Sequence, residues 1–169
     1  GETASGKYPV ESVQTMSRIA ASTEQGLQSS NLKPESATRF KSTRAVAHAG
    51  VELAKMAGAS RILVATERGN APRLVSSYRP GIPVTAVTDS LVTARRIQIL
   101  SGVDSVIVEE YERGSKTMQN AIALQLDSGK VQPGDKIVAI SGSPKAISGL
   151  TSTARLYKIS NSGEIVGTE

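Results

Sequence analysis

The chain has 169 residues, of which 38% are hydrophobic and 21% are charged, and this length corresponds to one globular domain or to one domain with an appendage. It contains no cysteine and a single histidine, His48, which excludes disulfides, a Cys/His zinc site and a cysteine nucleophile. The net charge is +5, and residues 39–79 hold eight basic and two acidic residues, which indicates an anionic partner.

The first predicted element is a helix over residues 9–29. Pro9 suits a first helical position. Apolar side chains then recur at helical spacing, at Val10, Val13, Met16, Ile19 or Ala20, and Leu27. Residues 30–41 contain Pro34 and no hydrophobic periodicity, which predicts a linker and a domain boundary.

Helices and short strands alternate in the rest of the chain. Further helices are predicted over residues 42–57, over 70–78, from Asp89 or Ser90 to Leu100, and from Ser115 to Gly129. Strands are predicted over residues 62–65, 84–87, 105–108, 136–140 and 153–159.

This alternation predicts a three-layer α/β fold with a mostly parallel, five-stranded sheet and helices on both faces. The last connection breaks the pattern. Only 12 residues, rich in Gly, Ser and Pro, separate Ile140 from the strand over 153–159, and a parallel crossover normally contains a helix. We therefore expect the fifth strand to be antiparallel and to lie at an edge.

Two loops have the composition of a phosphate site. In open α/β sheets, ligands bind beyond the carboxyl ends of the strands. The loop after the strand over 62–65 begins a helix, whose free amides favour phosphate, and consists of Thr66, Glu67, Arg68, Gly69, Asn70 and Ala71. The loop after the strand over 136–140 offers hydroxyls, glycines and a lysine, with candidates Ser141, Gly142, Ser143, Lys145, Ser148 and Gly149. Together they predict a phosphorylated small-molecule ligand; the alternative is that both are ordinary connecting turns.

No group of residues supplies a nucleophile, a base and an orienting residue, so we predict no catalytic residue and no metal ligand. His48 shares a polar helix face with Arg44, Glu52 and Lys55, which predicts an exposed or an interface face. Aromatic residues make up only 3% of the chain, which disfavours nucleic acid as the partner. No apolar run of membrane length and no signal peptide is evident, which predicts a soluble cytoplasmic protein.

The motifs, in their order, resemble those of pyruvate kinases. The chain opens with Gly1-Glu2-Thr3-Ala4-Ser5-Gly6-Lys7-Tyr8-Pro9-Val10-Glu11, which is similar to the segment that leads into the last helix of that family's catalytic barrel. The later motifs resemble the family's C-terminal domain, in the order Thr66-Glu67-Arg68-Gly69, Tyr78-Arg79-Pro80, Pro83-Val84-Thr85-Ala86-Val87-Thr88, Gly134-Asp135 and Ser141-Gly142-Ser143-Pro144.

The resemblance implies two parts, a remnant of the last barrel unit over residues 1–32 and a C-terminal regulatory domain over 33–169. It implies that the first and fourth strands are adjacent, which would place the two loops side by side. In the family this cleft holds effectors such as fructose 1,6-bisphosphate, sugar monophosphates or AMP. This chain has Arg68 and Ala71 where strong forms of the first loop carry hydroxyls, so the resemblance leaves the effector's identity open.

The resemblance also implies what the chain lacks and how it assembles. The family transfers phosphate from phosphoenolpyruvate to ADP with Mg²⁺ and K⁺, in a site on the barrel, so this piece alone would be inactive. The family forms homotetramers through its C-terminal domains, and the face of Arg44, His48, Glu52 and Lys55, with Tyr78 nearby, is the candidate interface. The alternative function is a free-standing α/β interaction or small-anion-binding module without enzymatic activity.

Overall fold

The computed structural model describes residues 1–26, 41–111, 115–142 and 150–167. The chain divides into two compact units, Gly1–Ser30 and Asn31–Glu169. Of the linker predicted over residues 30–41, only Lys41 is among the described residues, and it begins a helix.

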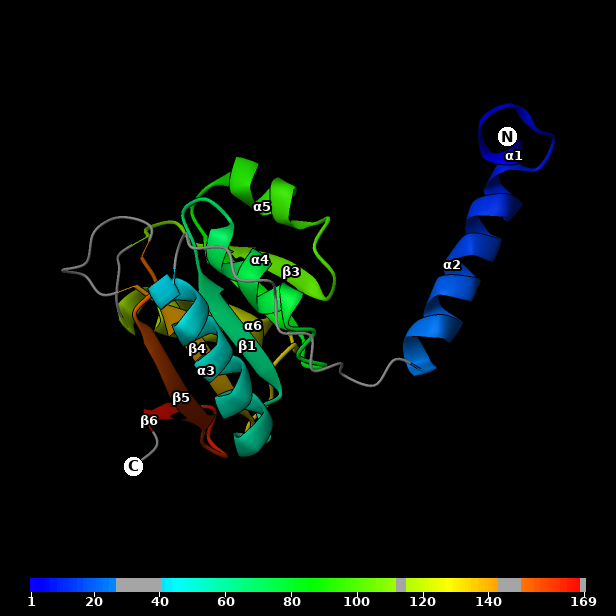
Figure 1. Cartoon of the computed structure of the whole chain (residues 1–169). Helices are drawn as coiled ribbons and strands as arrows, with labels where there is room; N and C mark the ends of the chain where they lie inside the picture. Colours follow the sequence, from blue (N-terminus) through cyan, green and yellow to red (C-terminus); the bar gives the residue numbers. More distant parts are fainter. Residues whose placement is uncertain (27–40, 112–114, 143–149, 168–169) are drawn as a thin grey trace. The chain divides into compact units, whose positions relative to one another are not determined.

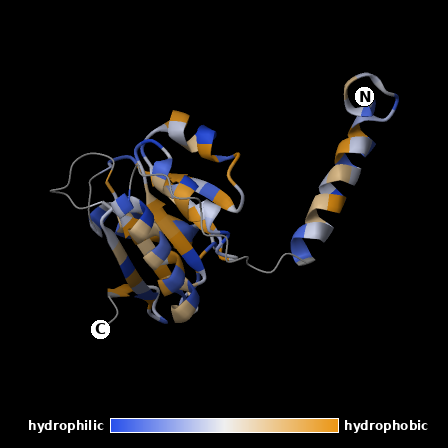
Figure 2. Cartoon of the chain, viewed as in Figure 1, coloured by the Kyte–Doolittle hydropathy of each residue, from blue (hydrophilic) through white to orange (hydrophobic). Residues whose placement is uncertain are grey.

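The first unit contains two helices, α1 (Glu2–Ser5) and α2 (Pro9–Gly26). The described part of the predicted helix therefore ends at Gly26. Its apolar side chains are all more than half exposed, at Val10, Val13, Met16 and Ile19. In Figure 2, hydrophobic segments in orange alternate with polar segments along α2. The helix therefore carries an apolar stripe that its own unit does not cover.

The second unit is built on a six-stranded sheet with the strand order β3-β2-β1-β4-β5-β6. Its strands are β1 (Arg61–Ala65), β2 (Val84–Thr88), β3 (Val103–Ile107), β4 (Lys136–Ser141), β5 (Thr153–Ile159) and β6 (Ile165–Gly167). The strands β1 to β4 are parallel to one another. β5 pairs antiparallel with β4, and β6 pairs antiparallel with β5. This confirms the predicted mostly parallel sheet with an antiparallel end and with β1 next to β4.

Helices cover both faces of this sheet, as predicted (Figure 1). One hydrophobic cluster joins the sheet to α3 (Lys41–Ala57), α4 (Asn70–Ser77) and α5 (Leu91–Ile97). A second cluster joins the other face to α6 (Ser115–Asp127). The central strand serves both clusters, because Ile62 and Val64 face the first and Leu63 faces the second. Burial on both faces explains why the strand is apolar from Ile62 to Ala65.

The sheet has one strand more than the sequence predicts. A tight turn after β5 places Gly163 at φ 84°, and the Ser160 amide donates to the Glu164 carbonyl oxygen at 2.8 Å. The chain then returns as β6, whose three residues pair with the end of β5. A strand this short has no sequence periodicity, so the pattern could not reveal it. As a result β5 is antiparallel, as predicted, but β6 and not β5 lies at the edge.

A polar cluster ties three neighbouring strands together. Asp104 on β3 accepts hydrogen bonds from Thr85 on β2 at 2.6 Å and from Lys130 at 2.7 Å. Arg61 on β1 donates to Thr85 at 2.7 Å and lies 3.3 Å from the Asp104 carboxylate. Burial opposes ionisation of Asp104, but the hydrogen bonds from Lys130 and Thr85 and the charge of Arg61 outweigh it and lower the pKa of this carboxyl group.

The lowered pKa of Asp104 makes stability depend on pH. Because the pKa of Asp104 is lower in the folded chain than in the unfolded chain, its ionised carboxylate stabilises the fold. This contribution to the free energy of unfolding is complete above about pH 3.8 and is lost as the pH falls through the folded pKa. We expect Asp104→Asn to lower the free energy of unfolding by about 1 kcal/mol at pH 7, since the group is partly exposed and its ion pairs are screened. The difference from the unchanged chain should shrink at pH 3. Urea unfolding at both pH values tests this, with Asp89→Asn, at an exposed aspartate, as the control. Equal losses at the two pH values would contradict it.

Candidate functional site

The carboxyl ends of β1 and β4 bring the two predicted loops to the same edge of the sheet. The strands are adjacent and parallel, with Val64 opposite Ile140. Thr66 follows β1 directly, and Ser141 is the last residue of β4. The two loops therefore begin at neighbouring positions, where ligands bind in open α/β sheets. The remaining predicted residues of the second loop lie outside the described residues, namely Ser143, Lys145, Ser148 and Gly149.

The first loop is a tight turn that Thr66 holds in place. The Thr66 side chain is buried, its amide donates to the Val87 carbonyl oxygen at 2.9 Å, and its Oγ1 accepts from the Gly69 amide at 2.8 Å. Gly69 has a φ of 85° and is the N-cap of α4. This backbone conformation favours glycine, so the turn explains why a glycine precedes the helix.

The loop exposes some of its predicted residues and buries others. Arg68 and Asn70 are exposed, and Glu67 is half-buried. Ala71 is 5% exposed and packs into the hydrophobic cluster under α4, so only its backbone could meet a ligand. Its neighbour Pro72 has no amide hydrogen. Recognition at this loop would therefore fall on the Arg68 and Asn70 side chains and on the first amides of α4.

The two ends of the second loop lie close together. The Ser152 amide donates to the Ser141 carbonyl oxygen at 3.0 Å, and a Cβ on Gly142 would lie 2.6 Å from the Leu150 carbonyl oxygen. Only glycine permits this backbone approach. The glycine at 142 therefore keeps the two ends of the loop together.

Two threonines that the sequence analysis did not single out anchor these loops. Thr43, buried in the first turn of α3, accepts from the Thr151 amide at 3.2 Å. Thr93, buried on α5, donates to the Glu67 carbonyl oxygen at 2.9 Å. Both partners are distant in sequence, so no local motif could have revealed them.

The same edge gathers helix N-termini. Both α4 and α5 begin there, because they follow β1 and β2, and Thr43 places the first turn of α3 beside the second loop. Each N-terminus carries a partial positive charge and free amides. The Ser90 hydroxyl caps α5 by accepting from the Thr93 amide at 3.2 Å. Together with the Arg68 guanidinium, this edge suits an anion.

The predicted interface face lies along α3. His48, Glu52 and Lys55 are exposed, and Arg44 is half-buried. Lys55 and Glu52 form an ion pair at 3.5 Å. Tyr78 is only 9% exposed; its ring lies 5.2 Å from the His48 ring, and its hydroxyl donates to the Arg44 carbonyl oxygen at 3.5 Å. Burial raises the pKa of Tyr78, an effect that the Arg44 charge partly offsets. Tyr78 thus supports the face from below.

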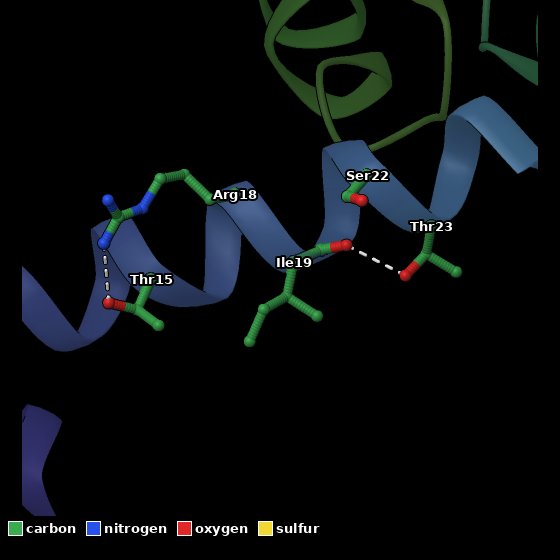
Figure 3. Close-up of a pocket in the computed structure, with 5 residues that line it drawn as sticks. All are labelled: Thr15, Arg18, Ile19, Ser22 and Thr23. Atoms are coloured by element: carbon green, nitrogen blue, oxygen red, sulfur yellow. Dashed lines mark hydrogen bonds between the residues drawn. The ribbon is translucent and has the colours of Figure 1, made fainter.

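A surface pocket also lies along α2 (Figure 3). All of its lining residues belong to that helix, namely Thr15, Arg18, Ile19, Ser22 and Thr23. Thr15 and Thr23 donate to carbonyl oxygens one turn back, and Arg18 donates to Thr15. Most of its polar atoms therefore serve α2 itself.

Two further kinds of feature are absent from the described residues, a metal cluster and a membrane span. Within them, no three His, Cys, Asp or Glu residues gather as metal ligands. None of the helices described here has the length and hydropathy of a membrane span.

Comparison with known proteins identifies the family to which this chain belongs. Residues 44–157 match the family described as "Pyruvate kinase, alpha/beta domain". The chain belongs to this pyruvate kinase family. The resemblance that the motifs indicate is therefore confirmed.

Relatives with this domain are whole pyruvate kinases. The pyruvate kinase of Staphylococcus epidermidis is 35% identical over 162 residues, covering 94% of this chain and 28% of the relative. That of Staphylococcus aureus is 33% identical over 180 residues, covering 99% and 31%. The crystal structure of a pyruvate kinase from Cryptosporidium parvum has a TM-score of 0.73 at 28% identity, covering 93% of this chain and 31% of that one. The chain thus spans less than a third of these pyruvate kinases.

Proposed function

We propose that the chain is the C-terminal regulatory and assembly part of a pyruvate kinase, and that its carboxyl edge binds a phosphorylated effector. The arrangement of the two loops supports this most directly: they start from adjacent parallel strands, next to helix N-termini and the exposed Arg68. In this proposal Arg68 and Asn70 bind the phosphate from the first loop, with Thr66, Glu67, Gly69 and Ala71 forming its backbone. Ser141 and Gly142 begin the second loop.

The two units have different parts in this proposal. Residues 1–32 are a remnant of the last barrel unit, and residues 33–169 are the regulatory domain. The exposed apolar stripe of α2 supports this, since such a stripe needs a partner and the relatives have more than twice as much further chain. The parent enzyme would transfer phosphate from phosphoenolpyruvate to ADP in the cytoplasm, with Mg²⁺ and K⁺ held by its barrel.

Assembly is the second role that we propose. The α3 face of Arg44, His48, Glu52 and Lys55 would meet the same face of another copy. Its opposite charges, with Glu52 between Arg44 and Lys55, suit a self-complementary contact. Tyr78, packed beneath His48, would keep this face rigid.

Calorimetric titration of the 169-residue chain tests the effector role. We expect saturable binding of at least one of fructose 1,6-bisphosphate, glucose 6-phosphate and AMP, because the edge offers amides and a guanidinium to a phosphate. We also expect no turnover of phosphoenolpyruvate with ADP, Mg²⁺ and K⁺. Flat titrations for all three ligands would overturn the effector role, and measurable turnover would overturn the assignment of catalysis to the rest of the enzyme.

A further inference from the structure

The terminal strand of the sheet carries an exposed apolar patch at its carboxyl end. In the part of the chain that the structure describes, β3 is the last strand on its side of the sheet, and α5 packs beside it (Figure 1). Leu91 and Val92 begin α5, Ile107 ends β3, and their exposed fractions are 51%, 60% and 47%. They are three of the seven exposed large apolar side chains that the structure describes in the second unit. Exposed apolar side chains that gather in this way mark a contact surface.

The strand register brings these three side chains to one corner of the sheet. Ile107 is paired with Thr88, the last residue of β2. Two residues, Asp89 and Ser90, then lead into the first turn of α5. Ile107 also shares a face of β3 with Val103, which packs in the same cluster as α5. The apolar patch therefore lies at the carboxyl ends of β2 and β3, on the face that α5 covers.

Carboxylates surround this patch. Asp89 directly follows β2, and Glu109 and Glu110 come just after β3; all three side chains are exposed. The Val108 amide donates to the Thr88 carbonyl oxygen at 3.0 Å, so β2 and β3 stay paired up to the residues that carry the carboxylates. The result is an apolar and acidic surface, the β3 corner, which consists of Asp89, Leu91, Val92, Ile107, Glu109 and Glu110.

The backbone of β3 offers hydrogen bonds beside this surface. The Val84 amide on β2 donates to the Gly102 carbonyl oxygen at 3.0 Å, and the Val108 amide also bonds to β2. In a parallel ladder, alternate residues of a strand bond to the same neighbour. The even-numbered residues of β3 therefore bond to β2, and Ser105 and Ile107 direct their amides and carbonyl oxygens away from it. An edge of this kind accepts a further strand.

We propose that the β3 corner binds a basic and apolar segment of another protein, which joins the sheet as a strand beside β3. The apolar side chains of the segment pack on α5 and Ile107, and its basic side chains face the three carboxylates. α5 is itself basic in its last turn, at Arg95 and Arg96, toward the start of β3. The basic residues of the segment therefore lie only at the carboxyl end of β3. In an antiparallel strand, the more stable arrangement, this is the segment's N-terminal end.

Mapping of NMR chemical shifts in the 169-residue chain tests this contact, which depends on neither the effector role nor the assembly role. The probe is a short peptide that begins with two lysines and continues with alternating valine and threonine, added up to millimolar concentration. We expect saturable shifts at the amides of residues 91–92 and 105–110, with little change on α3 and α6. A peptide with glutamates in place of the lysines should bind at least tenfold more weakly, because the corner is acidic.

Charge reversal at the corner is the decisive variant. Glu109→Lys/Glu110→Lys should raise the Kd of the lysine peptide at least tenfold. Asp127→Lys/Glu164→Lys is the matched control, because it changes the net charge by the same amount at two exposed residues outside the corner. It should alter the Kd less than threefold. Ile107→Lys should also weaken binding at least tenfold, through loss of the apolar contact and repulsion of the lysines.

Three results would overturn the proposal. The first is the absence of shifts at the corner with millimolar lysine peptide, and the second is equal binding of the glutamate peptide. The third is an equal loss of affinity in the two double variants, because the peptide would then respond only to the overall charge of the chain. Circular dichroism and urea unfolding verify that each variant is folded, so that a loss of binding reports on the corner itself.

Discussion

Replacing Gly50 with valine is expected to lower the free energy of unfolding by about 3 kcal/mol. Gly50 lies in the buried face of α3, where the helix packs directly on the sheet. A Cβ at this position would lie 2.5 Å from Cδ1 and 2.8 Å from Cγ1 of Ile140, and 3.6 Å from the Ala154 Cβ. Ile140 is fully buried, so its side chain has no free space to enter. Valine would therefore push α3 away from β4.

A matched control separates this overpacking from helix propensity. Ala49 is on the same helix and is exposed, so Ala49→Val changes propensity without filling the core. It should cost about 0.5 kcal/mol. Urea unfolding followed by circular dichroism measures both variants. If Gly50→Val cost no more than Ala49→Val, the close contact between α3 and β4 would be contradicted.

The order of the elements could be predicted from the sequence because the strands are buried on both faces. After Arg61, β1 continues as Ile62-Leu63-Val64-Ala65, a short apolar run that an amphipathic surface strand would not show. The helix caps were also local signals, since Ser90 does cap α5. The end of α5 could not be predicted as well from the sequence. The helix stops at Ile97, three residues before the predicted Leu100, because the Leu100 amide already bonds to the Ile97 carbonyl oxygen in a turn.

The candidate site was predictable as two loops but not as a set of side chains. Position along the chain placed Thr66 and Ser141 at strand ends, and the parallel pairing of β1 with β4 put them together. Which side chains face outward depends on tertiary contacts. Ala71 is buried because α4 packs on the sheet, and Thr93 reaches the loop from a helix 26 residues away. Such contacts have no sequence periodicity, so pattern analysis cannot supply them.

The basic residues between 39 and 79 do not form one positively charged surface. Several of them already have partners. Arg61 forms an ion pair with Asp104, Lys55 forms one with Glu52, and Arg79 donates a hydrogen bond to the Ser101 hydroxyl. Arg68 differs from them because it lies in the loop at the carboxyl edge of the sheet. We therefore expect the anion binding that we propose to depend on Arg68 more than on the other basic residues.

Arg68→Glu is expected to weaken binding of the phosphorylated effector about 100-fold, if not to abolish it. A charge-assisted hydrogen bond contributes about 1.5–3 kcal/mol, and reversing the charge replaces it with repulsion next to the α4 N-terminus. The side chain is exposed, so folding should not change. Arg73→Glu is the matched control, because Arg73 is also exposed but belongs to α4, the helix that follows the loop.

Calorimetric titrations of the unchanged chain and both variants, each at two salt concentrations, distinguish a local contact from a general field. Binding through Arg68 should be lost in Arg68→Glu and altered less than threefold in Arg73→Glu. Equal losses in the two variants would mean that only the overall charge of the surface attracts the ligand, since exposed charges act together over about 10 Å at 0.1 M salt. Unchanged affinity in Arg68→Glu would remove the first loop from the site and leave the second loop to bind the phosphate alone.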